Sequence, residues 1–160
     1  MKISAYRVVR SVRATDAFTG EGARVFGGRW NAPGQPVTYL SGSRALAVLE
    51  ILVHQSDLSP QAAFVRFEAV FSESLITVVD PTSLRRSWRR YPPGPETQSV
   101  GARWLAAAGT PVLRVPSVLI PEEPNYLFNP LHPRHGEIAI GPAEPFALDP
   151  RLEPHAARTR

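Results

Sequence analysis

A single glutamate on an otherwise apolar helical segment constrains the fold of this chain most. Residues 43–54 follow a short strand pattern at residues 37–40 and predict a helix, which Ser41 or Ser43 can cap. The side chains one turn away from Glu50 are Leu46, Ala47, Val53 and His54. The carboxylate therefore lies near an apolar stripe, where a partly buried charge needs a partner or a chemical task. Arg29 and a cationic ligand group are the candidate partners.

Composition indicates one globular domain. The chain has 160 residues, of which 43% are hydrophobic and 20% are charged. No apolar run approaches the length of about 18 residues that a membrane span requires. The N-terminal segment has no apolar region followed by a cleavage site, so no signal peptide is expected. Cysteine is absent, which excludes disulfides and thiolate chemistry and is compatible with a cytoplasmic protein.

The positive charge has two interpretations. Of the 18 basic residues, only Lys2 is a lysine, and the formal net charge is +4. Coding bias with a solvated surface explains this, and so does a polyanionic partner, because arginine binds phosphate and carboxylate groups in a bidentate manner. The same alternatives hold for the basic cluster RRSWRR at residues 85–90, which could contact nucleic acid or an acidic protein.

Strand patterns outnumber helical ones. Helices are expected at residues 43–54 and 96–108, and residues 10–36 are expected to form a long, glycine-rich irregular loop. The expected strands cover residues 4–9, 37–40, 64–71, 75–79, 112–120, 137–140 and 146–148. Two helices separated by several strands favour an α+β domain with a mixed, largely antiparallel sheet. We expect one domain at residues 1–150 and a polar tail at residues 151–160.

The motif GGRW at residues 27–30 could present Arg29 to a ligand, because glycines allow close approach. It could also be a turn with a surface arginine and a core tryptophan. Neither a P-loop nor a GxGxxG fingerprint is present. Tyr39 is either a core tyrosine with a paired hydroxyl or a ligand contact through its ring or hydroxyl.

A second unusual segment covers residues 116–133. Ser117 precedes an apolar run, and Asn125 and Asn129 are expected to fix a loop through turn hydrogen bonds. His132 and His135 lack the spacing of a metal site, so no metal is expected.

Taken together, these segments resemble the RES-domain family, the toxin half of bacterial RES–Xre toxin–antitoxin pairs. The matching motifs are YR at residues 6–7, GEGARVFGGRWN at residues 20–31, PVTYLSGSRALAVLEILVH at residues 36–54 and VPSVLIPEEPNYLFNPLHP at residues 115–133. Arg29, Glu50 and Ser117 match the arginine, glutamate and serine after which the family is named. Tyr39 matches the tyrosine between the first two.

The resemblance implies an ADP-ribosyltransferase-like fold and an NAD⁺-consuming toxin. NAD⁺ is then the substrate, and no separate cofactor is expected. An Xre-type antitoxin with a helix-turn-helix part would form a hetero-oligomer with the toxin, occlude its active site and repress the operon. DNA would be contacted only indirectly, through the antitoxin, and no membrane contact is expected.

Residue chemistry agrees with this implication. Cleavage of the nicotinamide–ribose bond passes through an oxocarbenium-like state, which the Glu50 carboxylate can stabilise. Arg29 is expected to clamp a phosphate or the adjacent ribose, and Tyr39 to stack on or orient the nicotinamide. Ser117 is expected to bind the nicotinamide side or position the acceptor, and Arg7 is a further substrate contact.

The sequence leaves three functions open. Water or phosphate as acceptor gives a glycohydrolase or a phosphorylase, and a protein side chain gives an ADP-ribosyltransferase. A non-enzymatic nucleic-acid-binding module built on residues 85–90 is the alternative from another class.

Overall fold

One sheet of eight strands organises the part of the chain that the structure, a computed structural model, describes, residues 1–54 and 63–152. Its strands are β1 (Lys2–Arg10), β2 (Thr38–Ser41), β3 (Phe64–Ser72), β4 (Ile76–Val78), β5 (Val112–Pro116), β6 (Pro124–Phe128), β7 (Ala139–Ile140) and β8 (Glu144–Phe146). The order is β4-β5-β6-β2-β1-β3-β7, and β8 also pairs with β3. Among these described strands, β4 and β5 form the one parallel pair, so the predicted mixed, largely antiparallel α+β fold is confirmed.

Three α-helices accompany the sheet within these residues: α1 (Glu21–Phe26), α2 (Arg44–His54) and α3 (Pro95–Ala107). The predicted cap of α2 is confirmed at Ser43, whose hydroxyl accepts the Leu46 amide hydrogen at 3.1 Å. In α3, Pro95 occupies the first turn, where its missing N–H leaves no helical hydrogen bond unmade.

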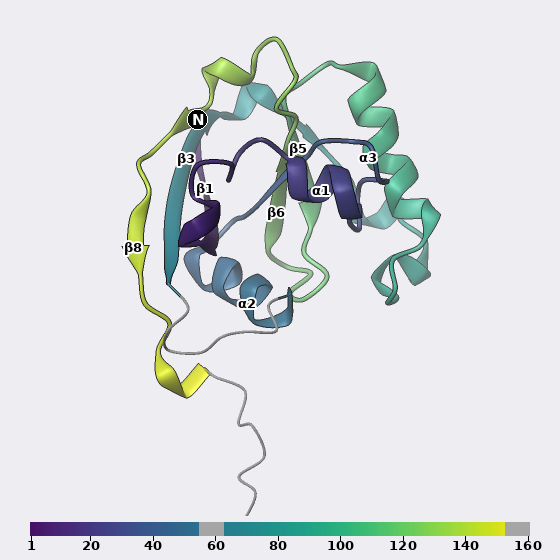
Figure 1. Cartoon of the computed structure of the whole chain (residues 1–160). Helices are drawn as coiled ribbons and strands as arrows, with labels where there is room; N and C mark the ends of the chain where they lie inside the picture. The colour runs from purple at the N-terminus through teal and green to yellow at the C-terminus, as the bar shows by residue number, and fades with distance from the viewer. Residues whose placement is uncertain (55–62, 153–160) are drawn as a thin grey trace, which may run out of the picture.

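Helices α2 and α3 cover the same face of the sheet. Tyr6 of β1 is paired with Ser41 of β2, so the alternation of side chains places Val8 and Tyr39 on one face. Val8 packs against α2, and Tyr39 packs in the cluster that contains Trp104 of α3. In Figure 1, α2 lies across the lower end of the strands and α3 runs along the right-hand side.

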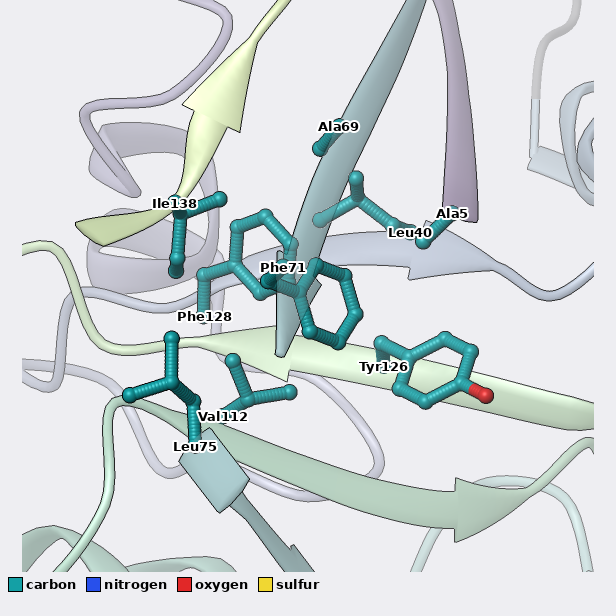
Figure 2. Close-up of a cluster of buried hydrophobic side chains, with 9 residues drawn as sticks. All are labelled: Ala5, Leu40, Ala69, Phe71, Leu75, Val112, Tyr126, Phe128 and Ile138. Carbon is teal, nitrogen blue, oxygen red and sulfur yellow. The ribbon is translucent and has the colours of Figure 1, made fainter. Parts of the chain in front are cut away.

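The opposite face carries the larger aromatic core, which Figure 2 shows. The ring of Phe71 meets Phe128 at 5.3 Å and Tyr126 at 5.5 Å between centroids, both edge-on. Leu40 and Val112 close this cluster from β2 and β5. The central strands are thus buried on both faces. This packing holds in position the strand ends, where polar residues of the candidate site lie.

Two predictions about local structure were wrong. Residues 10–36 are not irregular throughout, because they contain α1, a six-residue helix. Residues 124–128 were expected to be part of a loop, but they form β6, between β5 and β2. The last two strands lie at Ala139–Ile140 and Glu144–Phe146, so the expected strand at residues 146–148 overlaps β8 only at its end.

Two further sequence-based expectations concern the chain ends and membranes. Residues 153–160 of the expected polar tail lie outside the described residues. No helix within residues 1–54 and 63–152 is long and apolar enough to cross a membrane.

The contact between α3 and the GGRW segment predicts a severe effect of Gly101→Ala. A Cβ at Gly101 would lie 1.7 Å from the carbonyl oxygen of Trp30, so the backbone of one segment must move. We expect a loss of about 1–3 kcal/mol in the free energy of unfolding, measured by urea denaturation.

Gly22→Ala is the matched control. Gly22 lies in α1, and nothing approaches its added Cβ within 4 Å. This substitution should leave stability unchanged or raise it by about 0.5–1 kcal/mol. Equal effects of the two substitutions would contradict the packing described here.

Candidate active site

Asn31 holds the GGRW segment in place. Its side chain is fully buried, and its Nδ2 donates to the carbonyls of Ala23 at 2.8 Å, Gln35 at 3.0 Å and Ala32 at 3.2 Å. Its Oδ1 accepts a hydrogen bond from the Tyr39 hydroxyl at 2.7 Å. One side chain therefore ties the end of α1, the loop after it and β2 together.

The Tyr39 hydroxyl serves the protein itself. Besides donating to Asn31, it accepts the amide hydrogen of Trp30 at 3.1 Å. Burial raises the pKa of this phenol, so it stays protonated. A Cβ at Gly28 would lie 2.7 Å from the hydroxyl, so the close approach that glycine allows here is made by Tyr39. The Tyr39 hydroxyl is therefore hydrogen-bonded within the protein, as expected for a core tyrosine. Stacking of the Tyr39 ring on a ligand stays a prediction.

Arg29 faces two groups. Its Nη1 donates to the carbonyl oxygens of Trp88 at 2.6 Å and Arg90 at 3.0 Å, which connects it to the basic segment at residues 85–90. Partial burial lowers the pKa of Arg29, and the negative charge of Glu50 opposes this shift. Arg29, one of the two candidate partners of Glu50, thus interacts with it electrostatically, although no direct ion pair joins them within the described residues.

The direct partner of Glu50 is Asn125. Glu50 is half-buried, and its Oε1 accepts a hydrogen bond from Asn125 Nδ2 at 2.8 Å. The expected turn hydrogen bond is wrong for Asn125 but confirmed for Asn129, whose Oδ1 accepts the Leu131 amide hydrogen at 3.0 Å. Asn125 lies on β6 opposite Ser41, and it could be placed beside α2 only by recognising that strand.

Ser117 is fully buried and follows directly after β5. Its hydroxyl oxygen accepts the amide hydrogens of Leu119 at 3.1 Å and Ile120 at 3.3 Å, and its own amide donates to the Glu123 carbonyl. The Glu123 carboxylate in turn accepts a 2.6 Å hydrogen bond from Ser43, the cap of α2. Ser117 therefore shapes a turn that is bonded to the start of the Glu50 helix, and its contact with a ligand stays a prediction.

Arg7 supports the site from the other face. The alternation of β1 places its side chain with Ala5 and Val9, on the face opposite to α2. Its Nη1 donates to the Tyr39 carbonyl at 2.6 Å. Burial lowers the pKa of Arg7 to about 10, an effect that Asp16 partly opposes. A contact between Arg7 and substrate stays a prediction.

A groove of about 550 Å³ lies on the other flank of α2, over β1 and β3. Its lining includes Tyr6, Arg44, Glu68, Arg66 and Glu144, and none of the predicted site residues. Within residues 1–54 and 63–152, no three histidine, aspartate or glutamate side chains are grouped so as to hold a metal ion.

The hydrogen bonds of Tyr39 predict the effect of Tyr39→Phe. The variant keeps the ring but leaves Asn31 Oδ1 and the Trp30 amide without their partner in a buried site. We expect a loss of about 1–3 kcal/mol in the free energy of unfolding, measured by urea denaturation. Tyr126→Phe is the control, because the Tyr126 ring is buried but its hydroxyl has no hydrogen-bond partner within the described residues. A neutral Tyr39→Phe would contradict the anchoring role.

Comparison with known proteins shows which family this chain belongs to. The chain is 37% identical over 150 residues to "Toxin Res" of Yersinia enterocolitica, covering 92% of this chain and 98% of that protein. It is 36% identical over 157 residues to the "Prs ADP-ribosylating toxin" of a Sphingobium strain, covering 95% and 98%. It also resembles a chain in the crystal structure of the M. tuberculosis MbcT–MbcA toxin–antitoxin complex.

That structural likeness has a TM-score of 0.75 and 20% identity, and it covers 92% of this chain and 85% of the other. It therefore shows a shared fold. The model of the RES domain matches residues 4–149, nearly the whole chain. Together with the identities to the two toxins, this match shows that the chain belongs to the RES-domain family.

Proposed function

We propose that this protein is the toxin of a toxin–antitoxin pair and that it consumes NAD⁺ by cleaving the nicotinamide–ribose bond. The observation that carries the proposal is the Glu50 carboxylate, half-buried, oriented by Asn125 and electrostatically coupled to Arg29. A carboxylate fixed in this way suits a reaction that develops positive charge.

The bond that breaks joins C1′ of the ribose to the ring nitrogen of the cationic nicotinamide. Its electron pair stays with that nitrogen, so nicotinamide leaves as a neutral molecule and needs no general acid. The positive charge moves to the ribose, where Glu50 stabilises it and accepts a hydrogen bond from an adjacent ribose hydroxyl. An acceptor then forms a new bond to C1′ and releases its proton.

The other predicted residues have supporting roles in this proposal. Arg29 uses Nη1 to hold the carbonyls of residues 88 and 90. Its remaining guanidinium donors make no hydrogen bond to the described part of the chain and can bind a phosphate or ribose oxygen. The ring of Tyr39 stacks on the nicotinamide while its hydroxyl holds the loop. Ser117 forms the turn beside the nicotinamide or the acceptor. Arg7, on the opposite face of the sheet, supports the site through its hydrogen bond to the Tyr39 carbonyl, and its contact with the substrate stays a prediction.

Water as the acceptor gives a glycohydrolase, and inorganic phosphate gives a phosphorylase. A protein side chain as the acceptor gives an ADP-ribosyltransferase, and the name of the Sphingobium relative favours this as the second candidate function. All three reactions share the cleavage step and the same use of Glu50.

An antitoxin is the expected protein partner, as in the MbcT–MbcA complex. We propose an Xre-type antitoxin that forms a hetero-oligomer with this chain and covers the site. DNA would be bound by the antitoxin and contacted by this chain only indirectly. The proposed place of action is the cytoplasm, where NAD⁺ is available and no metal or further cofactor is required.

Release of nicotinamide from NAD⁺ by the purified protein tests the proposal. Glu50→Gln keeps the shape of the side chain and removes its charge, so we expect kcat to fall by about 10²–10³-fold. Glu68→Gln is the matched control, because Glu68 bonds Arg44 and Tyr6 on the other flank of α2. Wild-type turnover by Glu50→Gln would overturn the assignment, and mass spectrometry of the products names the acceptor.

Arg29→Lys separates charge from geometry. Lysine keeps the positive charge, but a single ammonium group cannot hold two backbone carbonyls and a phosphate as the planar guanidinium does. We expect KM for NAD⁺ to rise about tenfold or more, with a smaller change in kcat, in steady-state kinetics. Arg24→Lys, on the surface of α1, should leave KM unchanged. An unchanged KM for Arg29→Lys would exclude the clamp.

A further inference from the structure

Asn125 occupies a position that the strand pairing fixes. It lies on β6 between Ser41 of β2 and Val115 of β5, so both neighbouring strands limit its movement. The preceding residue, Pro124, accepts the Gly42 amide hydrogen at 2.8 Å, which holds this end of β6 against the start of α2. The side chain of Asn125 is therefore presented to Glu50 from a rigid element.

The orientation of the Asn125 amide is set by charge. Nδ2 donates to Glu50 Oε1 at 2.8 Å. The reversed amide would turn its carbonyl oxygen toward a carboxylate oxygen, and two acceptors repel each other. Glu50 therefore determines which way the Oδ1 of Asn125 points.

Among the residues that the structure describes, that oxygen has no hydrogen-bond partner. Asn125 Oδ1 is buried, and within the described residues no group donates to it. A buried acceptor without a hydrogen bond is costly, and such groups in native proteins call for an explanation. Here the unpaired oxygen is part of the same side chain that fixes the carboxylate of the proposed site, so a bound substrate is the natural source of a donor.

We propose that Asn125 Oδ1 accepts a hydrogen bond from the 3′-hydroxyl of the nicotinamide ribose, while Glu50 holds the neighbouring 2′-hydroxyl. This inference rests on the proposed function. Pyrophosphate oxygens are excluded as the partner because they are acceptors, whereas a hydroxyl can donate. A cis-diol carries its two hydroxyls on adjacent carbons, and it can bridge a carboxylate and an amide that are themselves hydrogen-bonded.

An NAD⁺ analogue that lacks the 3′-hydroxyl of the nicotinamide ribose tests this contact. We expect the kcat/KM of the wild type to be about tenfold or more lower on this analogue than on NAD⁺, because the missing 3′-hydroxyl leaves the buried Oδ1 unpaired. Asn125→Leu should lose a similar factor on NAD⁺ and then discriminate between the two substrates by less than about threefold, since the effects of interacting groups are not additive.

Asn125→Asp gives a second readout that a purely structural residue would not move. It keeps an acceptor oxygen for the hydroxyl but places a second carboxylate against Glu50, which raises the pKa of one of the two. The acid limb of the kcat/KM profile should therefore move to higher pH, with discrimination against the 3′-deoxy analogue retained. Asn129→Asp is the matched control, because Asn129 uses only its Oδ1, which aspartate preserves.

The outcomes distinguish a failure of the proposed function from a failure of the Asn125 contact alone. Absence of nicotinamide release by the wild type, in buffer, with inorganic phosphate and with cell lysate as the source of a protein acceptor, refutes the proposed function and this inference with it. Turnover with undiminished discrimination in Asn125→Leu, or an unshifted acid limb in Asn125→Asp, refutes the role of Asn125 alone. A loss of discrimination only against an analogue without the carboxamide group would assign Oδ1 to the nicotinamide and overturn the ribose contact.

Discussion

The hydrogen bond between Tyr39 and Asn31 is the interaction on which the site depends. It joins a strand of the sheet to the loop that follows the six-residue helix α1, and this loop is also held by the hydrogen bond from Gln98 to the Gly28 carbonyl and by the buried Trp30. Asn31 is fully buried and its amide is satisfied by three backbone carbonyls, so loss of the tyrosine hydroxyl leaves a polar group without compensation. The hydrogen bonds of Asn31 hold the backbone of the loop, and Arg29 lies two residues earlier on that backbone.

Arg29 connects this loop to a second segment of the chain. Its guanidinium holds the carbonyls of Trp88 and Arg90, and Arg89 donates to the Val118 carbonyl, next to Ser117. The basic segment at residues 85–90 is thereby bound to both Arg29 and the Ser117 turn. This contact gives the segment a structural role beside the site, whatever its exposed arginines bind.

Glu50 was recognisable from the sequence, but its environment was not. Helical spacing and the Ser43 cap are local signals. They sufficed to predict α2 and to show that the Glu50 carboxylate lies near its apolar stripe. The partner, Asn125, is 75 residues away, and its strand begins with Pro124 and Asn125, which favour turns. Pro124 is tolerated because it is the first residue of β6, and the apolar run that follows is buried between β5 and β2. Helix α1 escaped prediction because it is too short for a periodic signal, and the contacts of Arg29 with backbone carbonyls leave no trace in a sequence.

A crystal structure of the Glu50→Gln variant with NAD⁺ tests the central claim, that Glu50, Asn125 and Arg29 form an NAD⁺ site that is ordered before the substrate arrives. The account predicts the nicotinamide ribose against residue 50 and Asn125, a phosphate or the adjoining ribose against Arg29, and an unmoved Tyr39–Asn31 pair. NAD⁺ lying instead in the groove between α2 and β8, or a loop at residues 27–31 that rearranges to admit it, would contradict the account.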